Sequence, residues 1–304
     1  MFETLLSLIF VYLFILLGYF AKRFFKEQID NKTLTLTSVY FTQPFVTVWG
    51  FSTATLSTEH FWVPLYYLGI IAIVLLPTLF IAKLLFDDPK ERSIFSIAGF
   101  VGNTGNIGIP LGIALFGEGS VIYTTLINIA NVFVVYIIGV YIYSRGSFSI
   151  QKSLFNIVKI PIIPASVIAI VININHIQII PQIQEFLKMG AYAGIVLQLF
   201  LLGTFLYGIR IKLLRLPLLI GTLSQKFIIV PVTTAILLSF TQLPLYVQGV
   251  IFMEMMTPLA VANLNLAALY DCRPQETTTL IMLSTLLFIP VIFLLSQVIS
   301  NFYL

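Results

Sequence analysis

Long apolar runs, separated by short stretches of charged or turn-forming residues, make up most of this chain. A helix needs about 20 predominantly apolar residues to cross the hydrocarbon core of a bilayer. The runs therefore predict an all-α membrane protein with ten transmembrane helices. These helices are expected near residues 4–22, 33–52, 61–86, 93–116, 120–143, 154–172, 189–208, 217–239, 246–270 and 277–299.

Two of these segments, 93–116 and 246–270, are interrupted by prolines and other poor helix formers. The fourth contains the stretch VGNTGNIGIPL, with three glycines, two asparagines and Pro110, and the ninth contains Thr257 and Pro258. A proline inside a helix removes a backbone hydrogen bond, but it is well tolerated at the first position of a new helix. We therefore expect each segment to be two half-helices, with permissive backbone at Gly108 and with Thr257 as an N-cap.

The positions of Lys and Arg predict how the chain is oriented. Fourteen of the 16 basic residues lie in the odd-numbered connections between the runs, and the even-numbered connections hold only Lys188. Basic connections remain on the cytoplasmic side. Both termini are therefore expected to lie outside the cytoplasm.

Five predicted helices in each half suggest two related repeats, residues 1–148 and 149–304, within one transmembrane unit. A shift of 148 residues aligns Pro110 with Pro258, although the identity between the halves is weak. Because five is an odd number, the second repeat must be inverted relative to the first. The half-helices would then approach from opposite faces, and their N-termini, which carry unpaired N–H groups and partial positive charge, would form an anion site.

Polar side chains cluster at the same predicted depth as the two interruptions. The candidate substrate-binding residues are Asn103, Thr104, Asn106, Pro110, Asn128, Asn131, Thr257, Pro258, Asn263 and Gln43. Asn128 and Asn131 are three residues apart and share one face of a helix. Each amide could instead mediate helix packing, which is common in membranes.

Two charged residues are predicted to lie deep in the bilayer, Lys226 and Glu254. Ionisable groups at this depth are expensive and are usually functional. They are candidates for coupling or charge compensation, with Lys226 facing a carboxylate substrate and Glu254 binding a proton or cation. The alternative is that both lie near the membrane surfaces, where Lys226 would extend its ammonium to water.

Composition excludes several other functions. The chain is 59% hydrophobic and 9% charged, and its mean hydropathy of +1.03 is typical of a polytopic membrane protein. The net charge of +4 lies in short clusters between apolar runs, which does not favour nucleic-acid binding. One cysteine, Cys272, and two histidines, His60 and His176, provide no disulfide or metal cluster, and no cofactor is expected.

Several motifs resemble those of the auxin efflux carrier family, which includes plant auxin exporters and bacterial malonate or malate permeases. They are GNTGNIGIPLGIALFGEG in the fourth segment, MTPLAVANLNLAALYDCRPQETTTLIMLSTLLFIP in the ninth and tenth, and QKFIIVP in the eighth. The resemblance implies two inverted five-helix repeats whose fourth and ninth helices cross where they break, with substrate bound beside the crossing. The family's helix 4 asparagine falls on Asn103 or Asn106, and its two prolines fall on Pro110 and Pro258.

The resemblance also implies a scaffold bundle and a moving bundle that give alternating access. The connection between the fifth and sixth segments, from Ser144 to Ser153, is only about ten residues long. This length is typical of the compact bacterial members, in the plasma membrane, and does not favour auxin as the substrate.

The sequence therefore predicts a secondary active transporter that moves a small organic anion, a carboxylate, across the membrane. An intramembrane enzyme would need a general-base or metal constellation, and the nearest candidate, Asp87 to Glu91, is better explained as a solvated turn. A sensor that does not transport is a further alternative. The sequence leaves open whether H⁺ or Na⁺ accompanies the anion and whether the chain forms a homodimer.

Overall fold

The protein is helical throughout the part that the computed structural model describes, residues 2–52, 55–144, 158–207 and 215–303. In the first half the helices are α1 (Phe2–Phe25), η1 (Lys26–Gln28), α2 (Asn31–Thr37), η2 (Ser38–Thr42), α3 (Gln43–Ser52), α4 (Thr58–Leu85), α5 (Pro89–Ile97), η3 (Thr104–Gly108), α6 (Ile109–Phe116), η4 (Glu118–Ser120), α7 (Val121–Phe133), η5 (Val134–Gly139) and α8 (Val140–Tyr143). In the second half they are α10 (Ile162–Ile174), α11 (Pro181–Phe205), α12 (Leu216–Ser224), η7 (Gln225–Ile229), α13 (Val230–Ser239), α14 (Leu245–Met256), α15 (Ala262–Leu269) and α16 (Pro274–Phe302).

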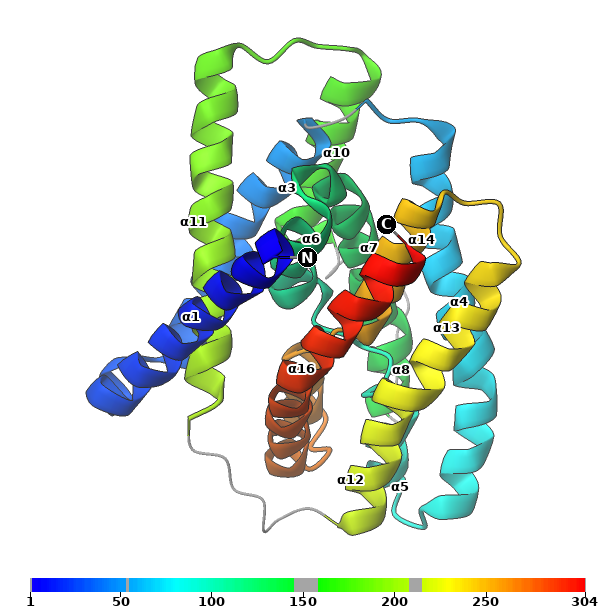
Figure 1. The fold of residues 1–304 in the computed structure, drawn as a ribbon. Helices are drawn as coiled ribbons and strands as arrows, with labels where there is room; N and C mark the ends of the chain where they lie inside the picture. Colours follow the sequence, from blue (N-terminus) through cyan, green and yellow to red (C-terminus); the bar gives the residue numbers. More distant parts are fainter. Residues whose placement is uncertain (1, 53–54, 145–157, 208–214, 304) are drawn as a thin grey trace.

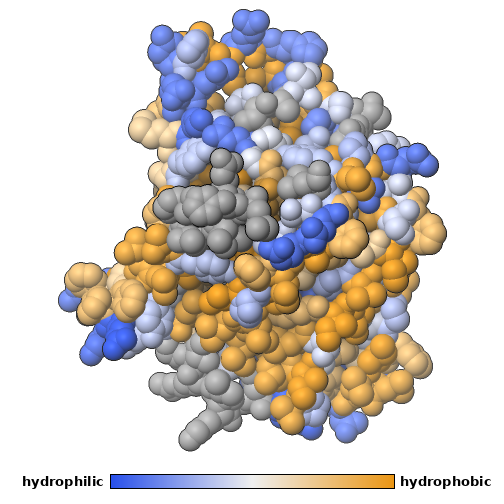
Figure 2. Space-filling view, viewed as in Figure 1, coloured by the Kyte–Doolittle hydropathy of each residue, from blue (hydrophilic) through white to orange (hydrophobic). Residues whose placement is uncertain are grey.

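Within these described residues, five helices are long and apolar enough to cross a membrane. They cover His60–Leu85, Glu118–Tyr143, Pro181–Phe205, Leu216–Ser239 and Pro274–Phe302. Helix α4 exposes Leu76, Phe80 and Leu84, which are 70%, 65% and 70% exposed and lie four residues apart on one side of the helix. Hydrophobic residues also cover much of the middle and lower surface in Figure 2. These apolar outer faces, together with the long apolar helices, show an integral membrane protein.

The helices form two packed groups, seen at the left and right of Figure 1. In the first group, α11 packs against α1 and α3, and α3 packs against α10. Gly18 of α1 and Gly203 of α11 face each other's helix so closely that a Cβ at either position would overlap the carbonyl of Phe200 or of Ile15. Small residues of this kind allow membrane helices to approach closely. We call this group the α1/α11 bundle.

The second group contains α4 to α8 and α12 to α16. Its core is formed by α4 packed on α5 and α7, by α14 packed on α7 and α13, and by α15 packed on α16. We call this group the α4/α14 bundle. The two bundles contact each other where α1 meets α6 and where α3 meets α7.

Both predicted interruptions are present, but the prolines do not begin the new half-helices. In the fourth segment α5 ends at Ile97 and the next helix begins at Thr104 with the π turn η3, so Pro110 lies in the interior of that helix. Gly108 has a helical φ of −60°, so the prediction that it supplies permissive backbone is wrong. Within the described residues, three of the four π turns, η2, η3 and η7, end two residues before a proline. A widened turn accommodates the missing N–H and the bulky ring.

In the ninth segment α14 ends at Met256 and α15 begins at Ala262. Pro258 lies in the non-helical connection between them. The prediction that Thr257 is an N-cap is also wrong, because its hydroxyl donates to the carbonyl of Glu254 at 2.7 Å and so closes the end of α14. Pro110 and Pro258 therefore occupy different places relative to the two interruptions, and their alignment does not mark equivalent structure.

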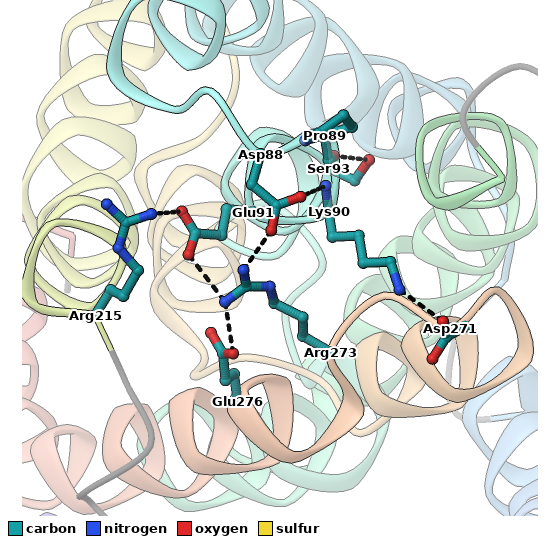
Figure 3. A network of polar contacts seen from close by, with 9 residues as sticks. All are labelled: Asp88, Pro89, Lys90, Glu91, Ser93, Arg215, Asp271, Arg273 and Glu276. Atoms are coloured by element: carbon teal, nitrogen blue, oxygen red, sulfur yellow. Dashed lines mark hydrogen bonds and ion pairs between the residues drawn. The ribbon is translucent and has the colours of Figure 1, made fainter.

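At one end of the α4/α14 bundle, ion pairs join three connections that are far apart in sequence (Figure 3). Arg273 pairs with Asp88, with Glu91 at 3.0 Å and with Glu276 at 2.8 Å, and Arg215 pairs with Glu91 at 2.7 Å. Asp88 caps α5, and the hydrogen bond from the Lys90 N–H, followed by the bond from Arg273, lowers its pKa below the usual value. The first turns of α5 and α16 and the start of α12 are thereby held together.

Four of the basic residues that predict the orientation lie in parts of the chain that the structure does not describe. Arg145, Lys152, Arg210 and Lys212 lie outside the described residues, as does most of the connection from Ser144 to Ser153 and the first part of the predicted span 154–172.

Candidate functional site

The two interruptions lie against each other through backbone hydrogen bonds. The N–H of Asn103 donates to the carbonyl of Pro258 at 2.8 Å, and the N–H of Ala260 donates to the carbonyl of Val101 at 2.9 Å. Gly102 and Leu259 form the antiparallel bridge between these two bonds. The non-helical backbone of each segment thus finds its hydrogen-bond partners in the other segment. Lipid could not provide such partners.

Asn263 stabilises this pairing with its side chain. Its amide nitrogen donates to the carbonyl oxygens of Val101 and Ala260, both at 3.2 Å, and the side chain is fully buried. One of these carbonyls belongs to each interrupted segment, so Asn263 holds the two segments together. We call the place where they pair, residues 101–103 and 258–260, the crossing.

Each new half-helix presents unpaired N–H groups at its start. In the described structure no acceptor is recorded for the N–H groups of Thr104, Gly105 and Asn106 at the start of η3, or for those of Val261 and Ala262 at the start of α15. The first N–H groups of any helix have no partner within it, and they carry the positive end of the helix dipole. Five such donors are therefore available on the two segments.

All five residues line one cavity of about 270 Å³ between the two bundles. The cavity also has hydroxyl groups from α2, η2, η3 and η5 and amides from α3, η3, α7, α15 and the residue before η3. None of the described residues that line it carries a charged side chain. Its polar side chains are those of Thr35, Tyr40, Gln43, Asn103, Thr104, Asn106, Asn128, Asn131, Tyr136 and Asn265.

A chain of hydrogen bonds orders the amides on one wall. The Tyr67 hydroxyl of α4 donates to Asn131 Oδ1 at 3.0 Å, and Asn131 Nδ2 donates to the Gly102 carbonyl at 2.9 Å and to Thr104 Oγ1 at 3.1 Å. Thr104 in turn donates to Asn128 Oδ1 at 2.9 Å. In the described structure Asn128 Nδ2 and Asn106 Oδ1 are buried atoms with no partner, so the wall has an amide donor and an amide acceptor that are not used in folding.

The structure places the predicted site residues in two different environments. Gln43, Asn103, Thr104, Asn106, Asn128 and Asn131 line the cavity, whereas Pro110, Thr257, Pro258 and Asn263 do not. The last three lie in or beside the crossing behind the cavity, and Pro110 lies further along α6. Asn128 and Asn131 share one face of α7, as their spacing predicts.

Lys226 and Glu254 lie together in the interior of the α4/α14 bundle, outside the cavity. Lys226 is 1% exposed, and its ammonium donates to the Met255 carbonyl at 2.9 Å. Glu254 is fully buried, and neither of its carboxyl oxygens has a hydrogen-bond partner among the described residues. Lys226 therefore does not extend its ammonium to water in this structure, and both residues remain candidates for coupling or charge compensation.

The two bundles also meet through residues that do not line the cavity. Glu118, at the start of η4, accepts a hydrogen bond from the Tyr192 hydroxyl at 2.6 Å and pairs with Lys188 at 3.1 Å, both on α11. On the same stretch of α11, Tyr192 packs on Trp49 of α3, with ring centroids 5.4 Å apart. The Glu118 contacts therefore join η4 of one bundle to α11 of the other, and Trp49 holds the Tyr192 ring in place.

Sequence reasoning did not select Thr35, Tyr40, Tyr136 or Tyr67. The first three contribute hydroxyls to the cavity wall, and Tyr67 orients Asn131. A tyrosine in an apolar helix is a weak signal, because its ring packs like any other aromatic side chain. The polar composition of residues 33–44 was the signal that could have identified Thr35 and Tyr40.

Comparison with known proteins agrees with this architecture. Residues 4–154 match the model of a family described as membrane transport protein. The chain is also 24% identical over 310 residues to an uncharacterized transporter of Methanocaldococcus jannaschii, a match that covers 96% of this chain and 97% of the relative. The chain therefore belongs to the membrane transport protein family, the auxin efflux carrier family that its motifs indicate.

Proposed function

We propose that this chain is a secondary active transporter that moves a small organic anion, a carboxylate, across the membrane. The observation that carries the proposal is the set of five unpaired backbone N–H groups around one uncharged cavity, at Thr104, Gly105, Asn106, Val261 and Ala262. Backbone N–H groups at helix N-termini bind anions. Family membership and the transporter relative support transport rather than catalysis.

The charge of the cavity favours a small anion. Each helix N-terminus is equivalent to roughly half a positive charge, so the two together balance about one negative charge. Asn128 Nδ2 and the hydroxyl groups of Tyr40 and Tyr136 add donors for the second carboxylate oxygen and for other polar groups of the substrate. A cavity of about 270 Å³ accommodates a small acid.

The two bundles provide a route for alternating access. The cavity lies between them and is lined from both. On one side are α2 and η2, which pack on α11 and so belong to the α1/α11 bundle, and on the other are η3, η5, α7 and α15. A displacement of the α4/α14 bundle along the α1/α11 bundle would carry the crossing from one side of the membrane to the other. The contact of Glu118 with Lys188 and Tyr192 would break in this movement.

In this proposal ten helices cross the plasma membrane, in two inverted halves, residues 1–148 and 149–304. Each bundle then takes matching segments from both halves: the first two of each half form one bundle and the last three form the other. Fourteen of the 16 basic residues lie in the odd-numbered connections, which supports cytoplasmic connections and external termini.

Exchange in proteoliposomes tests the function. The purified full chain is reconstituted with unlabelled acetate, lactate, malonate, malate or succinate inside, and entry of the same labelled acid is measured. We expect one or more of these acids to exchange. Asn106→Leu is expected to lower exchange by at least tenfold while it leaves folding unchanged, because Asn106 Oδ1 has no partner in the described structure.

Asn175→Leu is the matched control. Asn175 lies outside the cavity, and its amide nitrogen bonds to the Val171 carbonyl within the end of its own helix. Exchange by this variant should equal that of the wild type. Absence of exchange for every acid in the wild type would refute the proposed function, and normal exchange by Asn106→Leu would remove Asn106 from the site.

A further inference from the structure

We propose that Glu254 binds the coupling ion, a proton, and that Lys226 links this proton to the anion in the cavity. The inference rests on the proposed function and specifies its coupling ion, the residue that carries it and the charge that connects the two sites. The Glu254 carboxyl group is fully buried and has no hydrogen-bond partner at either oxygen in the described structure.

Glu254 lies close to the crossing and contacts both interrupted segments. It lies on α14, three residues before Thr257, and its carboxyl group packs against the backbone of Gly108 in η3. A Cβ at Gly108 would overlap both carboxyl oxygens, so the space that glycine leaves is the space that Glu254 fills. The carboxyl group therefore contacts both interrupted segments and would sense any change in how they cross.

Lys226 lies close to the wall of the cavity and to the end of α14 that carries Glu254. Its ammonium is 3.1 Å from the position that a Cβ on Gly102 would occupy, and Gly102 lines the cavity. The ammonium is bonded to the carbonyl of Met255, the residue next to Glu254. The positive charge is thus close to the carboxyl group on one side and to the wall of the anion site on the other.

This arrangement couples the two ligands electrostatically. When Glu254 is ionised, its charge compensates the ammonium, and the cavity experiences little net positive charge. When a proton binds to a carboxylate oxygen of Glu254, the ammonium is uncompensated in a medium that screens weakly, and an anion in the cavity restores the balance. By linkage, the bound anion then favours the protonated carboxyl group to the same extent.

A proton fits these surroundings better than a metal cation. Among the described residues, the titratable groups that interact with Glu254 are Lys226 of η7 and Tyr67 of α4, and the neighbouring elements η3, α6, α7, α13 and α16 add none. The described residues contain no cluster of three or more acidic, His or Cys ligands. A sodium ion at Glu254 would have a single carboxylate and would be repelled by the adjacent ammonium, whereas a proton needs one oxygen.

The test separates exchange from net transport. Proteoliposomes with wild type or Glu254→Gln receive the labelled acid that exchanges fastest, and entry is measured as exchange, as accumulation under an inward proton gradient, and as accumulation under an inward sodium gradient. Membrane potential is held at zero with valinomycin and equal potassium. Glu254→Gln has almost the same size and retains a neutral, protonated-like group.

We expect the wild type to exchange and to accumulate the acid at least fivefold under the proton gradient, with no response to sodium. Glu254→Gln should exchange within about threefold of the wild type and should show no accumulation. Accumulation by Glu254→Gln, or a wild type driven by sodium and not by protons, overturns the inference but leaves the proposed function intact. Absence of exchange by the wild type refutes the proposed function itself.

A second variant covers the case in which Glu254→Gln does not fold, as judged by gel filtration in detergent. Glu254→Asp keeps a titratable group, and we expect it to retain proton-driven accumulation with a shifted dependence of exchange rate on pH. An unshifted pH profile would contradict a role for this carboxyl group. Lys226→Met should weaken the apparent affinity for the acid at least tenfold and should abolish the response to the proton gradient, and an unchanged response would exclude Lys226 as the link.

Discussion

At the scale of single residues, the amides near the crossing have different roles that depend on their partners. Asn131 uses its side chain within the fold, whereas Asn128 and Asn106 each retain a buried atom without a partner in the described structure. Gly108 is needed because a side chain there would occupy the place of the Glu254 carboxyl group. An asparagine near the crossing therefore either stabilises the fold or keeps a polar atom for the proposed substrate, according to what it contacts.

Gly108→Ala tests the close approach at the crossing. The added methyl would overlap the Glu254 carboxyl group, and overpacking of this kind costs about 1–3 kcal/mol. We expect a lower unfolding midpoint in detergent and at least tenfold slower exchange. Gly69→Ala in α4 is the control, because nothing lies within 4 Å of its Cβ position, and it should be neutral or slightly stabilising. Equal behaviour of the two variants would show that Gly108 does not make this contact.

At the scale of elements, backbone hydrogen bonds between the two interrupted segments hold them in place, and the proline rings do not determine where the half-helices begin. The backbone bonds of Asn103 with Pro258 and of Ala260 with Val101 join them, and the half-helices then begin at Thr104 and Ala262. Asn263 and Asn265 lie two residues apart on α15 and so point to different sides of this short helix. The first is buried against the crossing, and the second is exposed and lines the cavity.

This difference predicts opposite phenotypes for two similar substitutions. Asn263→Leu removes two hydrogen bonds to buried carbonyls and should destabilise the protein by about 1–3 kcal/mol. Asn265→Leu should leave the unfolding midpoint unchanged and should reduce exchange, because it places an apolar side chain at the cavity wall. The unfolding midpoint and the exchange rate of both variants, measured on the same preparations, check the assignment. A stable Asn263→Leu protein would show that the crossing does not depend on this amide.

At the scale of the whole molecule, the ion cluster around Arg273 holds together one end of the α4/α14 bundle (Figure 3). Glu91 is fully buried there and pairs with both Arg273 and Arg215. This end contains the start of α5, which leads into one interruption, and the start of α16, which follows the other. The cluster therefore links the starts of the two interrupted regions, as a bundle that moved as one body in the proposed transport cycle would require.

Arg273→Met is expected to destabilise the protein by roughly 2 kcal/mol at pH 7, because it leaves three carboxylates close together and one of them buried. Lys90→Met removes a pair with Asp271 that is largely exposed, and it should change stability little. The measurement is the unfolding midpoint in detergent at pH 7 and pH 3.

The pH dependence follows from the lowered pKa of Asp88. A carboxyl group with a lowered pKa in the folded protein contributes stability that is present above its ordinary pKa of 3.8 and is lost as the pH falls below that value. The difference between wild type and Arg273→Met should therefore be smaller at pH 3 than at pH 7. A difference that does not change with pH would mean that Arg273 acts through packing alone.

The sequence by itself determined the membrane class, the places where two helices are interrupted and the shared face of Asn128 and Asn131. These are local properties, because apolar length, backbone-breaking residues and helical spacing act within one segment. Only the tertiary structure decided where the half-helices begin, which amides line the cavity and that the Lys226 ammonium lies beside Gly102 and Met255. The physical reason is that a hydrogen bond such as Asn103 to Pro258 joins residues far apart in the chain, and no pattern within one segment specifies its partner.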